Sequence, residues 1–217
     1  MHQRHQKGQR FCLICFDELS AGKSMIDLWL REDVICGKCR SRFHPFNRMA
    51  DVMGLQVYGL YQYDEMMSTM MHQYKECHDE TLSRCFLYPQ LKRLRKRYKG
   101  CTLVLVPSAI EKTEERGFHA VKTIFSELNL PILDCLSKDS DIKQSTSNPL
   151  VRHTIAAHLH LHSENELIGK DVLLVDDVCT TGSTMKACAD LILPYAASIQ
   201  CLSVSIHPLL IKSKRFL

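Results

Sequence analysis

The sequence has no run of apolar residues that approaches the ~20 needed for a helix to cross a bilayer. Its first ten residues, MHQRHQKGQR, are basic and polar, so they lack the apolar segment of a secretory signal. Long-period repeats and low-complexity tracts are also absent. These absences argue against membrane, collagen-like and disordered proteins, and we expect a cytoplasmic protein without a membrane span.

A strong excess of charge of one sign is missing too, because 28 Lys and Arg residues face 24 Asp and Glu residues. The net charge of +4 is too small to identify a nucleic-acid-binding protein. Hydrophobic residues make up 45% of the 217 residues and charged residues 24%, the balance of a globular protein. A chain of this length buries enough surface to fold without a disulfide framework.

Cysteine, by contrast, is plentiful, with 11 residues. Cys12-x-x-Cys15 is followed, after 20 intervening residues, by Cys36-x-x-Cys39. Two such pairs supply the four corners of a tetrahedral zinc site, and four protein ligands leave no open position for chemistry. The alternatives are a redox-active pair or buried free thiols, and His44 is a further possible ligand. We interpret residues 1–50 as a small zinc ribbon or finger whose metal is structural.

Residues 51–217 alternate between strand and helix patterns, which predicts an α/β domain with a mostly parallel sheet and flanking helices. A helix after Asp64 is indicated by Met66, Met67, Met70, Met71 and Tyr74, which we expect in the core. The expected strands are 57–63, 102–106, 132–136, 172–175 and 198–206, the further expected helices are 114–128 and 183–193, and 137–148 is an expected loop.

The strongest motif begins with the buried strand 172–175, continues with Asp176 and Asp177, and ends in a hydroxyl-rich turn that opens a helix. Such a turn points backbone N–H groups and hydroxyls at one anion, and the helix N-terminus adds partial positive charge. The two carboxylates suit the hydroxyls of a ribose attached to that phosphate, directly or through a metal. The simpler alternative is a strand–turn–helix in which Asp177 or Thr181 only caps the helix. Cys179 could have a lowered pKa at the helix start or could be a small filler.

This segment resembles the phosphoribosyl pyrophosphate (PRPP) signature of type I phosphoribosyltransferases. The resemblance implies that Asp176 and Asp177 hold the ribose hydroxyls and are the candidate catalytic residues. It further implies that the 5′-phosphate is cradled by Thr180, Thr181, Gly182, Ser183 and Thr184. It also implies that Mg²⁺ binds together with PRPP.

Together with the paired cysteines, nearly the whole chain resembles the ComF family of late competence proteins. Further matches to that family are Lys75, the 105–108 segment that ends at Ser108, Arg116-Gly117-Phe118, Gln144 and Arg152. The chain departs from the family at His119-Ala120, where the family usually has Asn-Gln, at Ser108-Ala109, and at Ile155.

A diphosphate requires several cations that converge from separate loops. The candidates in this sequence are Lys75, Arg116, Lys143 and Arg152, and Arg116 leads because the neighbouring Gly117 permits a close approach. Residues 92–99 carry six positive charges around Tyr98. We interpret this basic run as the solvated end of a helix, and the alternative is a contact with single-stranded DNA.

The resemblance implies a role in DNA uptake during natural transformation, with a helicase-type partner, recombination mediators and possible contact with single-stranded DNA. Two other functions stay open. The chain can be an active phosphoribosyltransferase with an unidentified nitrogen acceptor, or a nucleic-acid-binding regulator that uses the zinc module and the basic run.

Overall fold

The computed structural model describes residues 11–19, 34–108, 110–139 and 158–212. The chain divides into two compact units, Met1–Phe43 and His44–Leu217. The boundary predicted at residue 50 falls inside strand β1 (Pro45–Val52) of the second unit. Lys143 and Arg152, two of the predicted pyrophosphate ligands, lie outside the described residues, as does Gln144.

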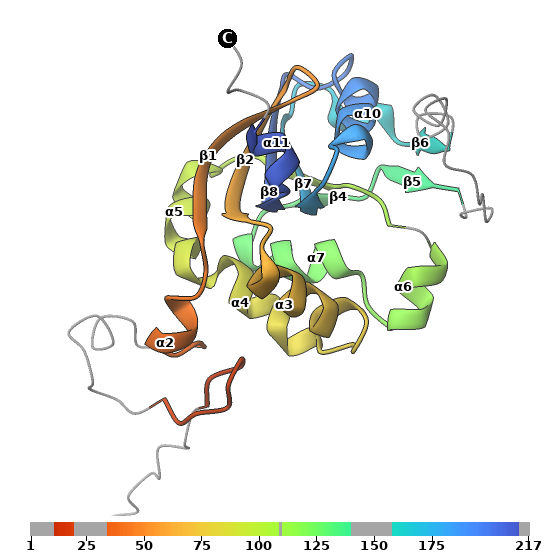
Figure 1. Cartoon of the computed structure of the whole chain (residues 1–217). Coiled ribbons are helices and arrows are strands. Elements are labelled where there is room, and N and C mark those ends of the chain that lie inside the picture. Colours follow the sequence, from red (N-terminus) through yellow and green to blue (C-terminus); the bar gives the residue numbers. More distant parts are fainter. Residues whose placement is uncertain (1–10, 20–33, 109, 140–157, 213–217) are drawn as a thin grey trace, which may run out of the picture. The chain divides into compact units, whose positions relative to one another are not determined.

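The second unit is built on a six-stranded sheet with the strand order β1-β2-β8-β7-β3-β4. Its strands after β1 are β2 (Leu55–Gln62), β3 (Thr102–Leu105), β4 (Ile132–Leu133), β7 (Asp171–Cys179) and β8 (Ser198–Ile206). Strand β1 pairs with β2 in antiparallel fashion, and all other neighbours are parallel. A separate antiparallel pair joins β5 (Leu136–Lys138) to β6 (Leu159–Leu161). The predicted class, a mostly parallel α/β sheet with flanking helices, is confirmed (Figure 1).

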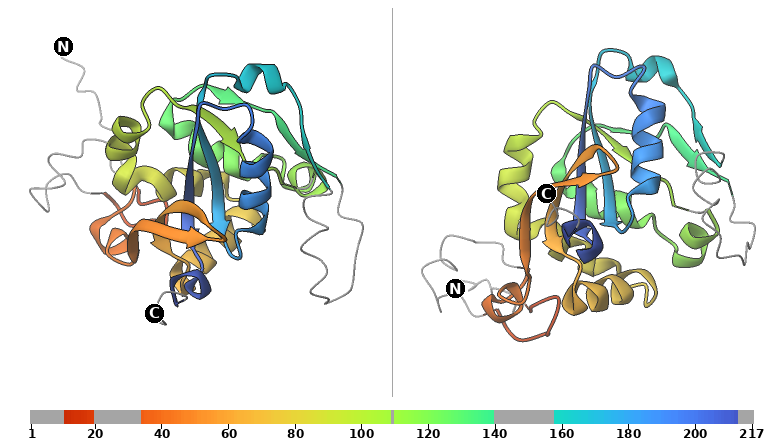
Figure 2. Two further views of the ribbon diagram at one scale, coloured as in Figure 1. Left: turned by 90° about the horizontal axis from the view of Figure 1, so that it is seen from above. Right: turned by 45° about the horizontal axis from the view of Figure 1, so that its top comes forward.

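Helices cover both faces of the sheet (Figures 1 and 2). Val172 and Leu174 of β7 pack in one cluster with Met185, Cys188 and Ile192 of α10 (Ser183–Ile192). Because side chains alternate along a strand, Leu173 and Val175 point to the opposite face. The remaining helices are α3 (Glu65–Lys75), α4 (Ser83–Leu87), α5 (Leu91–Arg97), α6 (Ile110–Arg116), α7 (Ala120–Phe125), α9 (Glu164–Leu167) and α11 (Pro208–Lys212), with 3-10 turns η1 (Glu80–Leu82), η2 (Tyr88–Gln90) and η3 (Ser126–Leu128).

Helix α3 follows the predicted pattern. Asp64 caps its first turn by accepting a hydrogen bond from the Met67 N–H (2.9 Å). Of the apolar residues predicted in the core, Met66 is only half-buried, and the buried ones are Met67, Met70, Met71 and Tyr74. His44 contacts the same Asp64 carboxylate, so it is engaged in the second unit. None of the helices in the described residues is long and apolar enough to span a bilayer.

Two predictions about local structure are wrong, and one strand was not predicted. The helix predicted over 114–128 is broken into α6 and α7, because Gly117 takes a left-handed φ of +79° directly after α6. The strand predicted over 132–136 is two separate strands, β4 and β5, and β5 takes up the start of the predicted 137–148 loop. Strand β1 was not predicted, since its exposed positions give no clear alternation.

The basic run is partly absorbed by packing. Arg95 donates two hydrogen bonds to the Glu127 carbonyl (2.9 and 2.7 Å). Arg97 lies over the Tyr58 ring at 4.3 Å, and Arg93 donates a hydrogen bond to the Tyr58 hydroxyl. Three of the six cations therefore hold α5 against its neighbours, which favours the structural interpretation of this run.

Candidate functional site

The candidate site lies at the carboxyl end of β7, the edge at which open α/β sheets bind ligands. Strand β7 is longer than predicted and runs through the acidic pair to Cys179. Two fully buried serines of β8 hold its last residues. Ser203 accepts a hydrogen bond from the Cys179 N–H (3.1 Å), and Ser205 donates one to the Asp177 carbonyl (3.4 Å).

The turn after β7 leads directly into α10, as the motif predicts. Gly182 has a φ of +74° and is buried, whereas Thr180 and Thr181 are exposed. The Thr181 hydroxyl lies 3.0 Å from the Ser183 hydroxyl and accepts a hydrogen bond from the Ser183 N–H (3.3 Å). Thr184 stands in the first turn of α10, where backbone N–H groups lack intrahelical partners. Hydroxyls and a helix N-terminus thus meet here, which is the donor set that a phosphate requires.

The tip of the β1–β2 hairpin packs against this turn. Met53 and Gly54 form its two-residue loop, both with positive φ. A Cβ on Gly182 would lie 1.8 Å from Cγ1 of Val52, so only glycine fits there. The Ser183 hydroxyl also lies 3.9 Å from the Met53 sulfur. The hairpin was not predicted, and Gly54 directly before the apolar stretch 55–62 is the signal that could have indicated its turn.

The acidic pair is electrostatically asymmetric, because successive side chains of a strand point to opposite faces. Asp177 is buried, and its Oδ2 lies 2.5 Å from Nζ of Lys75. Asp176 accepts a hydrogen bond from the Asp177 N–H (2.9 Å). Burial, followed by the neighbouring charge of Asp177, raises the pKa of Asp176 to about 7. Asp176 therefore holds its proton more tightly than an ordinary aspartate, whereas Asp177 lies against the ammonium group of Lys75.

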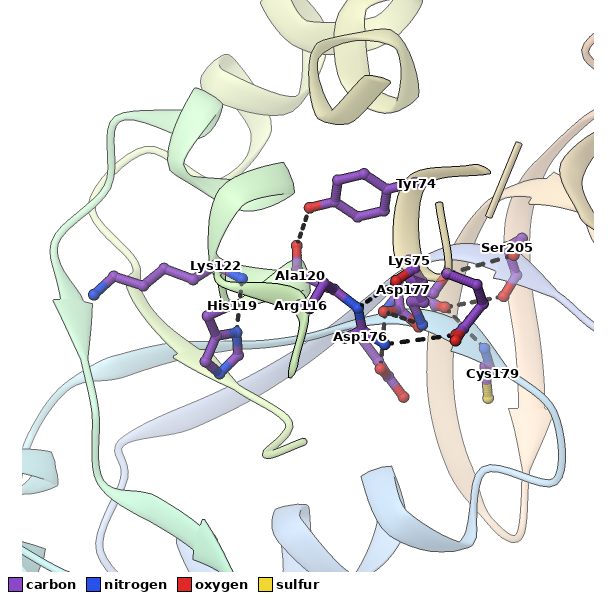
Figure 3. A network of polar contacts seen from close by, with 12 residues as sticks. Tyr74, Lys75, Arg116, His119, Ala120, Lys122, Asp176, Asp177, Cys179 and Ser205 are labelled. Atoms are coloured by element: carbon purple, nitrogen blue, oxygen red, sulfur yellow. Dashed lines mark hydrogen bonds and ion pairs between the residues drawn. The ribbon is translucent and has the colours of Figure 1, made fainter. Parts of the chain in front are cut away.

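Arg116 lies beside this pair but makes its own contacts with α3 (Figure 3). Its Nε donates a hydrogen bond to the Lys75 carbonyl (2.8 Å), and its guanidinium lies 3.6 Å from Glu76. The Arg116 side chain is only 7% exposed. Gly117 ends α6 with a left-handed φ of +79°, and a Cβ there would meet nothing within 4 Å.

His119 and Ser108 complete the predicted positions in the described residues. Nδ1 of His119 accepts a hydrogen bond from the Lys122 N–H (3.3 Å), so His119 caps α7 at the position where the family usually has Asn. Burial lowers the pKa of His119. Ser108 follows β3, whose neighbour in the sheet is β7, so it stands at the same edge of the sheet. Cys179 is buried, and this burial raises its thiol pKa to about 12, so it fills space in the turn and does not form a reactive thiolate.

The first unit holds the four predicted cysteines together. The sulfurs of Cys12, Cys15, Cys36 and Cys39 all lie within 4.8 Å of one another, and those of Cys15 and Cys36 are 3.7 Å apart. Tetrahedral zinc with Zn–S bonds of about 2.3 Å separates its sulfurs by about 3.8 Å, so the cluster has the right size.

The local structure around these cysteines has the character of metal knuckles. Cys36 caps the short helix α2 (Gly37–Arg40). Although burial opposes it, N–H donors led by that of Cys36 lower the pKa of Cys12 to about 7. This group of cysteines can hold a structural metal ion.

Comparison with known proteins agrees with this geometry. The family model described as "Phosphoribosyl transferase domain" matches residues 113–211. Competence protein ComFC of Streptococcus pneumoniae is 26% identical over 180 residues, which cover 82% of this chain and 72% of that protein. Competence protein ComFC of Bacillus subtilis is 24% identical over 208 residues, which cover 82% and 86%.

Among solved structures, a hypoxanthine phosphoribosyltransferase from Staphylococcus aureus aligns with a TM-score of 0.37 and 17% identity. That alignment covers 60% of this chain and 65%, less than two thirds, of the other. The same enzyme from Trypanosoma cruzi aligns with a TM-score of 0.36 and 18% identity, over 58% and 67%.

Proposed function

Because the chain is a ComF-type protein with a phosphoribosyltransferase-like domain, we propose that this domain binds PRPP together with Mg²⁺ at the carboxyl end of β7. The observation that carries the proposal is the junction of two adjacent carboxylates with a hydroxyl-rich turn at the start of α10. A phosphate attached to a sugar is the ligand that matches both halves of this site.

Each half binds a different part of the ligand. Thr180, Thr181, Ser183 and Thr184 donate hydrogen bonds to the 5′-phosphate, and Gly182 keeps the backbone close to it. Asp176 and Asp177 accept hydrogen bonds from the ribose hydroxyls, while Ser108 lies on the pyrophosphate side. Mg²⁺, when bound, supplies neutralisation of the pyrophosphate charge.

The arrangement also favours a second candidate function, transfer of the phosphoribosyl group to a nitrogen acceptor. In that reaction pyrophosphate leaves C1 of the ribose, and positive charge develops on the sugar. The carboxylates beside the ribose are suited to stabilise this charge. Turnover would be detected as release of pyrophosphate in the presence of a nitrogen acceptor.

For the cell, the likeness to two competence proteins supports a role in DNA uptake during natural transformation. Such a role in the cytoplasm involves a helicase-type partner, recombination mediators and incoming single-stranded DNA. Deletion of the gene in the source organism should sharply reduce the transformation frequency. An unchanged frequency would refute this part of the proposal.

In the first unit, zinc is the ion that four thiolates at this spacing select, and its role is structural because the cysteines fill all four positions. Binding energy for the metal then becomes folding energy for residues 1–43.

The deciding experiment is calorimetric titration of PRPP with Mg²⁺ into zinc-loaded protein. The test variant is Asp176→Asn/Asp177→Asn, which keeps side-chain volume, and Asp190→Asn on the exposed face of α10 is its matched control. We expect micromolar affinity in the wild type and the control and its loss in the test variant. Folded wild-type protein that binds no PRPP would overturn the proposal.

A further inference from the structure

Residues 116–120, where α6 ends and α7 begins, contact the carboxyl end of α3. Arg116 bonds to the Lys75 carbonyl (2.8 Å), and the Tyr74 hydroxyl donates a hydrogen bond to the Ala120 carbonyl (2.7 Å). The Phe118 ring packs on the Tyr74 ring, with centroids 5.1 Å apart. These three contacts fix residues 74 and 75 relative to residues 116–120. Figure 3 shows the two hydrogen bonds.

Arg116 meets a specific need of the helix end. Lys75 is the last residue of α3, so its carbonyl is one of the final four that have no N–H partner within the helix. A positively charged donor at this place satisfies the carbonyl and also complements the negative end of the helix dipole. Since the Arg116 side chain is 7% exposed and its Nε is already bonded, this donor is committed to α3.

Fixing the Lys75 backbone has a consequence at the acidic pair. The lysine side chain leaves the Cα that is bonded to the carbonyl group held by Arg116, and its Nζ lies 2.5 Å from Oδ2 of Asp177. Asp177 is 8% exposed, so its carboxylate has little access to water and depends on this cation. An unanchored lysine would lose conformational entropy on forming the same ion pair, since its side chain has many rotamers.

We propose that Arg116 is a positioning residue that acts through Lys75: it holds the lysine on Asp177 and thereby sets the charge that the acidic pair presents to a ligand. This inference rests on the proposed PRPP site and replaces the sequence-based expectation that Arg116 binds pyrophosphate directly.

Two substitutions separate positioning from direct binding. In Arg116→Gln the amide nitrogen stands the same number of bonds from the backbone as the arginine Nε, so it can still donate to the Lys75 carbonyl. Arg116→Ala removes the donor altogether. If Arg116 binds pyrophosphate directly, both variants should lose its function, because both lack the positive charge. If Arg116 positions Lys75, glutamine should preserve that function and alanine should not.

The first readout needs no ligand. The ammonium protons of Lys75 should be detectable by ¹H–¹⁵N NMR, because a partly buried ion pair slows their exchange with water. We expect the Lys75 signal in the wild type, in Arg116→Gln and in Arg95→Ala, a control that also removes an arginine bonded to a main-chain carbonyl. The signal should be lost in Asp177→Asn and in Arg116→Ala. Its persistence in folded Arg116→Ala protein would overturn the proposal.

The second readout is PRPP affinity in a double-mutant cycle. Arg116→Ala should weaken binding about tenfold in the wild-type background and have no further effect in Lys75→Met, because it acts through the lysine. An equal loss in both backgrounds would mean that Arg116 contacts the ligand itself. If the wild type binds no PRPP at all, the proposed function fails, and the NMR result still decides whether Arg116 positions Lys75.

Discussion

Val52 occupies the space that a side chain on Gly182 would need, with its Cγ1 1.8 Å from the Cβ position of that glycine. The two residues are 130 positions apart in the sequence, yet they join the hairpin tip to the hydroxyl-rich turn of the proposed phosphate site. The conformation of the turn therefore depends on packing against the β1–β2 hairpin as well as on the sequence of the turn. Its geometry should respond to changes in the hairpin.

Replacement of Gly182 by alanine should be far more harmful than replacement of Gly54. Both glycines have positive φ, so both variants carry a backbone cost of about 1 kcal/mol. A Cβ at Gly54 meets nothing within 4 Å, whereas at Gly182 it adds an overlap worth roughly 1–3 kcal/mol. Urea unfolding measures the difference, and Gly182→Ala/Val52→Ala should recover the steric part. Equal losses in the two single variants would contradict the contact.

Much of the fold could be predicted from the sequence, because its most regular helices and strands have local patterns of apolar residues. Buried strands such as 172–175 and the apolar stripe of α3 depend on short-range periodicity, and the structure has both. The break between α6 and α7 escaped prediction because Gly117 looks like an ordinary interruption within an amphipathic stretch.

The parts of the site that could not be predicted depend on long-range contacts. The sequence identified Lys75 and Arg116 as cations near a phosphate, but each alone is compatible with a ligand contact. Only the fold brings the Arg116 Nε to the Lys75 carbonyl and the lysine to Asp177. The hairpin contact with Gly182 is of the same kind, since no pattern within 45–62 refers to residue 182.

Thiol reactivity should report the metal site directly. Outside the four clustered cysteines, Cys77 is exposed and the other six are buried. Burial raises the pKa values of Cys179, Cys188 and Cys201 to about 12, which suppresses the reactive thiolate form. In zinc-loaded protein, one thiol, that of Cys77, should therefore react rapidly with a disulfide reagent. Removal of the zinc by a chelator should raise the number of rapidly reacting thiols to five, Cys77 and the four clustered cysteines.

The control for this thiol count is Cys77→Ser, which should start from no fast thiol and gain four on chelation. Metal analysis in parallel should find one zinc per chain. Fast reaction of the clustered cysteines before chelation would argue against a closed metal site.

Asp176 should destabilise the ligand-free protein as the pH rises. Its pKa lies at about 7 in the folded protein, above the ordinary 3.8, so the folded state binds the proton more tightly than the unfolded chain. The free energy of unfolding should then decrease as the pH rises from about 3.8 to about 7, and it should stay at the lower level at higher pH. Because one pKa unit is worth roughly 1.4 kcal/mol, Asp176→Asn should gain on the order of 2 kcal/mol at about pH 8 after allowance for partial exposure. Asp190→Asn, an exposed carboxylate, should show no such gain, and the same gain in both variants would exclude this origin.

His119 should make the opposite pH-dependent contribution. Its Nδ1 accepts the Lys122 N–H at the start of α7, which requires the neutral imidazole. Burial lowers its pKa below 6.5, although the charges of Asp134 and Asp177 oppose this effect. The stability that His119 contributes is therefore present above the ordinary pKa and is lost as the pH falls through the lowered one.

His119→Asn keeps a capping acceptor and should remove this pH dependence, whereas His119→Ala should cost about 1 kcal/mol near neutral pH through loss of the cap. Urea unfolding at a series of pH values checks both variants, with the exposed His72→Asn as control. A stability curve for His119→Asn with the wild-type slope would show that the pH dependence arises elsewhere.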